Sequence, residues 1–251
     1  MKRNYALILA TSALLGSPLQ AQETKQLTAD QLVAKNIEAK GGAEALHALQ
    51  SVKLTGKMLV NEGQLELAYT EIKKRPDAVR TELTLQGMTM VQAYDGKDGW
   101  KISPFQGRKD PEKLSDDDNK ALMEDAEIGG PLVDWKEKGS KVEYLGTEDV
   151  DGTQAHKLKV TRKNGDVNYV YLDPDYFLEI RIVTQRMEHG AQVETETDLS
   201  DYEKVNGVFL PLSTESGPKR SSDKAKLIIE KAEGNVPVDD KAFQFPAAPS
   251  K

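Results

Sequence analysis

The sequence predicts a mainly β protein (α+β), in which a curled antiparallel sheet of about ten or eleven strands forms an incomplete β-barrel with helices covering its open side. Most of the chain alternates apolar with polar or charged residues, which is typical of strands with one buried face. Turn dipeptides that contain glycine separate these segments at even spacing. The helical patterns carry too little apolar surface to cover a flat sheet of this size, so we expect the sheet to curl.

Residues 1–21 have the features of a cleavable secretory signal peptide. Lys2 and Arg3 precede an apolar stretch at residues 5–15 that is too short to cross a membrane. The chain contains no cysteine, which excludes disulfides, zinc–thiolate sites and a lipid-anchored N-terminal cysteine. We therefore expect a periplasmic protein with no lipid anchor and no transmembrane segment, in which residues 22–251 form one domain.

The charge balance is acidic, with 41 Asp and Glu residues against 34 Lys and Arg residues and a net charge of −7. Loss of Lys2 and Arg3 with the signal peptide would make the mature chain more negative still. This balance argues against nucleic acid as a partner and against electrostatic attachment to an anionic membrane. The simplest interpretation is solubility, and we expect a monomer.

Two short helices are predicted at the start of the mature chain. Thr28 and Gln31 match a capping box for a helix that runs to about Lys40, where Gly41-Gly42 ends it. One or two further helical turns follow at residues 43–49. The apolar stripe of the first helix is narrow, so we expect it to lie on a larger apolar surface; the stripe consists of Leu32, Val33 and Ile37.

The first half of the sheet begins directly after these helices. Alternation indicates strands near residues 52–60 and 65–69, and then a meander over residues 79–105 whose turns are Gln86-Gly87 and Asp95-Gly96. The β pattern is then interrupted by a predicted helix. Ser115 is a suitable N-cap, three aspartates follow it, and Gly129-Gly130 ends the segment. A further short helix is predicted around Trp135.

The second half of the sheet shows the same alternation to the end of the chain. Turn signals such as Asn164-Gly165, His189-Gly190 and Asn206-Gly207 separate its strands. The even spacing indicates an up-and-down order, with strands near residues 142–144, 156–160, 167–171, 178–182, 193–199, 208–212 and 227–229.

A curled sheet with a small helical cover can enclose an apolar cavity, with inward side chains of Leu, Ile, Val and Met and few polar atoms. The first helix would close over the inward face of the first four strands. The candidate lining residues are Leu32, Val33, Ile37, Leu54, Met58, Leu65, Leu67, Leu83, Leu85, Met88, Met90 and Trp100. The alternative is an ordinary packed core, filled by the methionines and by Trp100, Phe105 and Trp135.

Groups that could assemble a catalytic or metal site are scarce. The histidines are His47, His156 and His189, and no HExxH or HxxxH spacing relates them. No G-x-S-x-G motif and no phosphate-binding loop occurs. We expect no catalytic residues, no metal ligands and no cofactor, and hence a protein that is not an enzyme.

Three segments together resemble a known family. They are ADQLVAKNIEAKGGAEALHALQSVKLTGKM at residues 29–58, YDGKDGW at residues 94–100, and the terminal pair Val236-Pro237 and FQFP at residues 243–246. They are similar to the periplasmic outer-membrane lipoprotein-sorting proteins, which are related to the Lol-type lipoprotein carriers. The resemblance spans most of the mature chain.

The resemblance implies an incomplete antiparallel barrel with a helical lid that holds lipid acyl chains. It also implies a shuttle in outer-membrane biogenesis, which takes a lipoprotein or other hydrophobic ligand from an inner-membrane transporter to an outer-membrane acceptor. The carriers lock their lid with an arginine, for which the candidates here are Arg75, Arg80, Arg108, Arg181 and Arg186. The alternative function is an envelope-stress sensor or regulatory interaction module on the same fold.

Overall fold

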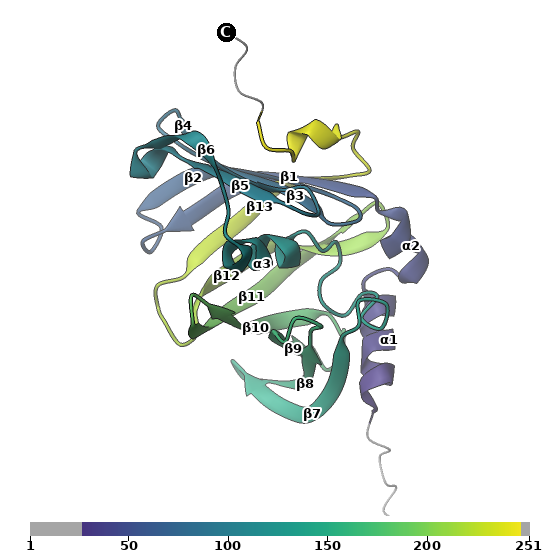
Figure 1. The fold of residues 1–251 in the computed structure, drawn as a ribbon. Helices are drawn as coiled ribbons and strands as arrows, with labels where there is room; N and C mark the ends of the chain where they lie inside the picture. The colour runs from purple at the N-terminus through teal and green to yellow at the C-terminus, as the bar shows by residue number, and fades with distance from the viewer. Residues whose placement is uncertain (1–26, 247–251) are drawn as a thin grey trace, which may run out of the picture.

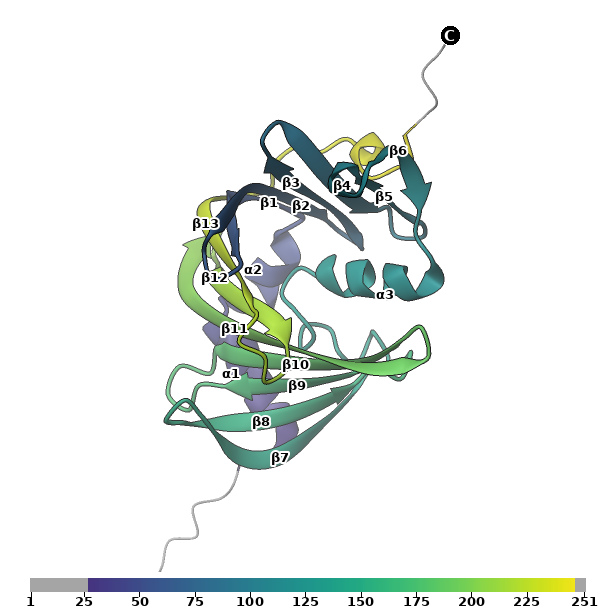
Figure 2. The same ribbon diagram turned by 90° about the vertical axis from the view of Figure 1, so that its left-hand side faces the viewer.

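The computed structural model describes residues 27–246, so the predicted signal peptide lies outside the described part of the chain. All of its strands belong to one antiparallel sheet, which curls into an open half-barrel and confirms the predicted mainly β fold (Figures 1 and 2). The sheet has 13 strands rather than about ten or eleven. They are β1 Ser51–Val60, β2 Leu65–Lys74, β3 Ala78–Leu85, β4 Met88–Tyr94, β5 Gly99–Ser103, β6 Arg108–Lys113, β7 Lys141–Val150, β8 Thr153–Thr161, β9 Val167–Leu172, β10 Glu179–Glu188, β11 Ala191–Val205, β12 Val208–Pro218 and β13 Ala225–Gly234.

Two local predictions need correction. Strand β6 reads RKDPEK, and because it contains a proline and no apolar residue, the period-two pattern did not predict it. The helix predicted around Trp135 is absent from the described chain, since residues 131–139 form successive turns. Asp134 and Gly139 have φ angles of 54° and 72° there, which a right-handed helix does not allow.

The order of the strands explains how the chain encloses a space. The sheet runs β6-β5-β4-β3-β2-β1-β13-β12-β11-β10-β9-β8-β7, so the first and last strands pair at its centre. The chain leaves the centre through β1, reaches one edge at β6 and must then cross to the opposite edge at β7. Helix α3 (Asp116–Asp125) lies on this crossing. Figure 2 shows it between the two arms of the sheet, one of which runs from β1 to β6 and the other from β13 to β7.

Close contact between β1 and β13 depends on a glycine. The register of this pair shifts between Thr55 and Gly56, which marks a bulge. A Cβ atom at Gly56 would lie 2.0 Å from the carbonyl oxygen of Ile228. Only glycine therefore lets these two backbones meet where the two arms of the sheet join.

The two N-terminal helices are α1 (Ala29–Ala39) and α2 (Ala43–Ala48), and Thr28 and Gln31 form the predicted capping box. The predicted place of α1 over the first four strands is wrong. Leu32 and Val33 instead join a buried cluster with Leu158, Val160 and other residues of the β7–β10 arm. Helix α2 packs beside it, where Leu46 contacts Ile128 of the segment after α3. Both helices lie at the same end of the sheet (Figure 1).

Candidate functional site

A cavity of about 540 Å³ lies between the two arms of the sheet, next to α3. This volume is within the range that is usual for small-molecule binding sites. Strands from both arms contribute to its lining, as do α3 and the segment that follows it. The interior of the half-barrel is therefore only partly filled by side chains.

One wall of the cavity is aliphatic. Its side chains come from alternate positions of the central strands and of β3 and β4, which direct every second residue to the concave face. The wall consists of Leu54, Met58, Leu83, Met90, Leu199, Leu210, Leu212, Leu227 and Ile229. Two flexible methionine side chains in this wall can adapt to ligands of different shape.

The twelve residues that the sequence suggested for the lining are distributed over four places. Leu54, Met58, Leu83 and Met90 line the cavity. Four more share their face of the sheet but lie nearer the hairpin tips, outside the cavity lining: Leu65, Leu67, Leu85 and Met88. Leu32, Val33 and Ile37 belong to the core that α1 forms with the opposite arm.

Trp100 lies on the opposite, convex face of the sheet. It pairs with Ala93 on β4, whereas the neighbouring Gln92 faces the cavity. Its indole Nε1 donates a hydrogen bond of 2.7 Å to the carbonyl oxygen of Phe243, which is itself buried. The C-terminal FQFP segment at residues 243–246, which carries part of the family resemblance, therefore lies on the outside of the barrel and away from the cavity.

The cavity also contains a charged region that the sequence analysis did not predict, so the expectation of few polar atoms is wrong. Glu71 and Lys73 of β2, Glu124 and Asp125 of α3, and Arg186 of β10 all line it. The alternation of residues along β2 could have predicted two members of this region. Glu71 and Lys73 have the same parity as Leu67 and Tyr69, which makes them inward-facing.

Helix α3 contacts the two arms through two different faces. Its apolar residues Leu122 and Ala126 pack against Val79 and Tyr94 of β3 and β4. Its other face is acidic and lies toward the β8–β10 arm. The serine predicted as its N-cap, Ser115, accepts a hydrogen bond from the backbone of Asp118 and thus fixes where the helix begins.

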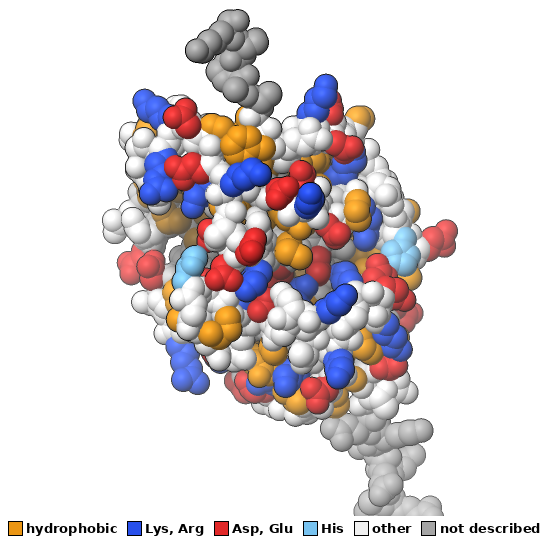
Figure 3. All heavy atoms as spheres, in the orientation of Figure 1, with side chains coloured by type: hydrophobic (Ala, Val, Ile, Leu, Met, Phe, Trp, Pro, Cys, Tyr) orange, Lys and Arg blue, Asp and Glu red, His pale blue; other side chains and the backbone are white. Residues whose placement is uncertain are grey.

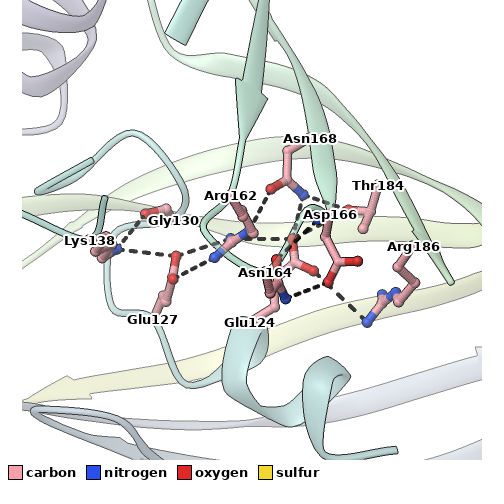
Figure 4. A network of polar contacts seen from close by, with 10 residues as sticks. All are labelled: Glu124, Glu127, Gly130, Lys138, Arg162, Asn164, Asp166, Asn168, Thr184 and Arg186. Atoms are coloured by element: carbon pink, nitrogen blue, oxygen red, sulfur yellow. Dashed lines mark hydrogen bonds and ion pairs between the residues drawn. The ribbon is translucent and has the colours of Figure 1, made fainter. Parts of the chain in front are cut away.

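The acidic side of α3 makes a polar network with the opposite arm, which Figure 4 shows from close by. Arg162 donates to both carboxylate oxygens of Glu127, over 2.7 and 3.2 Å. Glu124 accepts from Asn168 and, over 3.4 Å, from Arg162 and Thr184. Burial alone would lower the pKa of Arg162, but Glu127 and Glu124 outweigh it and raise that pKa. The network joins the two arms across α3.

Asp125 is the acid of this region with the most perturbed environment. Asp125 is exposed, yet it lines the cavity, where the surrounding side chains limit the hydration of its carboxylate. Poor hydration raises the pKa of its carboxyl to about 6, against a usual value of 3.8. This value is the net result of several effects, because Lys73 and Arg186 lower the pKa while Glu71 and Glu124 also raise it.

A buried ion pair closes the end of the cavity near the helices. Lys40 Nζ lies 2.7 Å from Glu179 Oε1 and also donates to the carbonyl oxygen of Gly129 over 2.8 Å. The hydroxyl of Tyr202 donates to the backbone oxygen of Glu179. Burial and, to a smaller extent, the negative charge of Glu179 raise the pKa of Tyr202 well above 10. These contacts fix the segment after α3 to the end of α1.

The five candidate lid arginines occupy different places. Arg75 donates to the carbonyl oxygens of Leu46, Leu49 and Ile128, and so ties α2 to the segment after α3. Arg186 lines the cavity. The other three lie outside the cavity lining: Arg80 and Arg181 on the convex face and Arg108 on the edge strand β6.

Within residues 27–246, no group of three or more His, Cys, Asp or Glu side chains is placed to hold a metal ion. None of the helices in this range is long and apolar enough to cross a membrane. On the face shown in Figure 3, acidic and basic side chains are interspersed.

No protein-family model matches the chain, and no curated protein matches it. Several solved structures are similar. A DUF1329 family protein from Desulfovibrio piger has a TM-score of 0.60 at 16% identity, over 86% of this chain and 97% of that one. A LolA superfamily protein from Nitrosomonas europaea has a TM-score of 0.58 at 13% identity, over 87% and 98%.

A third similar structure is a putative outer membrane lipoprotein-sorting protein domain from Vibrio parahaemolyticus. Its TM-score is 0.53 at 14% identity, over 84% of this chain and 97% of that one. The three structures show that this chain has the fold found in LolA superfamily and lipoprotein-sorting proteins. This agrees with the resemblance seen in the sequence.

Proposed function

We propose that the protein is a periplasmic carrier that holds the acyl chain of a lipoprotein, or of another hydrophobic ligand, between the two arms of its sheet. The observation that carries this proposal is the cavity of about 540 Å³ with its wall of leucine, isoleucine and methionine side chains. A packed core would fill this space, because voids in protein interiors are costly. A removable apolar ligand accounts for keeping it open.

Helix α3 would act as the lid of this carrier. Its apolar contacts with Val79 and Tyr94 keep it on one arm, whereas its contacts with Arg162, Asn168 and Thr184 on the other arm are polar. Water can replace polar contacts more readily than it can replace apolar packing. The β8–β10 arm could therefore separate from α3 and admit a chain without unfolding of the sheet.

The resemblance to lipoprotein-sorting proteins suggests the partners. An inner-membrane transporter would load the carrier and an outer-membrane acceptor would unload it. The proposed role is binding and transfer of a hydrophobic ligand, which the aliphatic wall of the cavity supports.

Protein purified from its native periplasm provides the test. Denaturing mass spectrometry should release a bound lipid or lipoprotein, and the emptied protein should take up a fluorescent fatty acid. Finding neither would reject the proposal. Crosslinking in cells should capture lipoproteins, whereas capture of an inner-membrane regulator alone would favour the regulatory alternative.

A further inference from the structure

Arg186 differs from the other charged residues of the cavity in its hydrogen bonding. Its side chain is 13% exposed and lines the cavity from β10. Its Nε and Nη1 atoms are buried and have no hydrogen-bond acceptor among the described residues. Glu188 Oε1 lies 3.2 Å from Nε and Glu124 Oε2 lies 3.9 Å from Nη1. These carboxylates offset the charge of Arg186, but neither accepts a hydrogen bond from its Nε or Nη1 atom.

A buried guanidinium whose N–H groups lack acceptors is unfavourable in a way that Arg186 cannot relieve by itself. Arginine does not lose its proton at any physiological pH, so its N–H donors remain donors. Asp125, the other charged group of the cavity without a direct partner, can take up a proton as the pH falls. Glu124 already accepts hydrogen bonds from Asn168, Arg162 and Thr184. The group that is missing in this region is therefore a hydrogen-bond acceptor for Arg186.

Three threonine hydroxyls lie on the same face of the sheet as Arg186; that of Thr184 already donates to Glu124, and that of Thr197 is hydrogen-bonded to Ser216. Thr184 lies two residues along the same face of β10, and it pairs across the sheet with Thr195 of β11. Thr197 follows on that face, and all three threonines line the cavity. Hydroxyl groups beside a guanidinium are a suitable environment for the oxygen atoms of an anion. The aliphatic wall begins at Leu199, further along β11, and continues over β12, β13, β1, β3 and β4.

We infer that the cavity takes a single-chain amphiphile with an anionic head group, whose oxygen atoms accept hydrogen bonds from Arg186 while its chain lies on the aliphatic wall. This inference rests on the proposed carrier function and adds the chemical class of the ligand. The planar guanidinium matches the geometry of a carboxylate or a phosphate, which are the head groups of a fatty acid and of a lysophospholipid. Both head groups present the oxygen acceptors that the site requires.

The test compares four probes with the same alkyl chain near neutral pH: dodecanoate, dodecyl phosphate, dodecanol and dodecylamine. Each is titrated against the full mature protein after removal of any bound lipid. The two anions should bind at least about tenfold more tightly than dodecanol, which is the usual effect of a hydrogen bond to a charged group. Tighter binding of dodecanoate would identify a fatty acid as the source, and tighter binding of dodecyl phosphate a lysophospholipid.

Variants assign the effect to Arg186. Arg186→Gln should remove the preference for anions but retain binding of dodecanol. The matched control is Arg108→Gln, since Arg108 is 58% exposed on β6 and lies outside the cavity lining; it should keep the preference. If Arg186→Gln does not fold, Arg186→Met replaces it, because apolar residues of similar volume commonly substitute for buried charges. Thermal unfolding without ligand establishes that each variant is folded.

The outcomes separate this inference from the carrier function. Equal affinity for dodecanol and dodecanoate, tighter binding of dodecylamine, or an unchanged preference in the folded Arg186 variant would each overturn the anionic head group. In these cases the carrier function would stand. If none of the four probes bound, the carrier function itself would fail, and the inference would fail with it.

Discussion

Arg162 Nη1 lies 2.7 Å from Glu127 Oε1, and this contact joins the end of β8 to the segment that follows α3. The side chains of Arg162 and Glu127 are 14% and 11% exposed, so solvent screens the pair only weakly. The topology makes this contact important, because α3 is the crossing between the two edges of the sheet. The two arms are joined at β1 and β13, and this contact holds their far parts together across α3.

We predict that Arg162→Gln destabilises the protein and loosens the cavity. The substitution leaves Glu124 and Glu127 partly buried without their cation, which should lower the free energy of unfolding by about 2–4 kcal/mol. Release of a bound fluorescent fatty acid should also become faster. Urea unfolding and stopped-flow release measure the two effects. Arg108→Gln, which removes an exposed ion pair with Glu112, should cost less than about 1 kcal/mol; an equal cost for both variants would contradict the role of Arg162.

The pH dependence of stability should reveal Asp125. Its pKa is about 6 in the folded protein and 3.8 in the reference state, so the folded protein binds the proton more tightly. Protonation of Asp125 therefore contributes stability that is fully present below about pH 3.8 and is lost as the pH rises through about 6. The asparagine of Asp125→Asn does not titrate, so this contribution to the pH dependence of stability is absent from the variant. The variant should be more stable than the wild type near neutral pH, and this advantage should shrink as the pH falls toward 4.

Urea unfolding of both proteins at several pH values measures this difference. Solvent in the cavity screens part of the effect, so the direction of the change is the prediction. A difference that stays constant across this pH range would contradict the environment described for Asp125.

Trp100→Phe should lower stability without changing ligand binding. The substitution removes the donor to the carbonyl oxygen of Phe243 and leaves that buried oxygen unpaired, at a cost of about 1–3 kcal/mol. Because Trp100 faces the convex side, uptake of a fluorescent fatty acid by the folded variant should equal that of the wild type. Weaker uptake at unchanged stability would place Trp100 in the binding site after all.

Local chemistry was well predicted from the sequence, because it depends on neighbouring residues. Thr28 and Ser115 are the N-caps that their sequence context indicates, and the turns at Gln86-Gly87 and Asn206-Gly207 have the positive φ angles that such dipeptides favour. Strand β6 was missed because its charged sequence carries no period-two signal. The curl of the sheet followed from a general argument about size and twist.

The partners of each face depend on the whole topology and were poorly predicted. Trp100 has the large apolar side chain expected of a cavity wall, yet the register with Ala93 places it on the convex face. Leu32 and Val33 face the β7–β10 arm, although the first strands are nearer in sequence. The ionic region combines Glu71 and Lys73 of β2 with Asp125 of α3 and Arg186 of β10, and no sequence pattern relates these three elements.

The measurement that tests the cavity most directly is uptake of a fluorescent fatty acid by Leu83→Trp. Leu83 lines the open space, so an indole at this position should occupy the volume that the acyl chain needs. The variant should unfold at nearly the wild-type temperature and bind the probe at least about tenfold more weakly. Leu145→Trp, on the exposed edge strand β7, controls for the added tryptophan and should bind normally. Leu158→Trp, in the closed core under α1, should cost about 1–3 kcal/mol or more by overpacking. Wild-type uptake by Leu83→Trp, or a loss of stability as large as that of Leu158→Trp, would contradict an open acyl-binding cavity at this position.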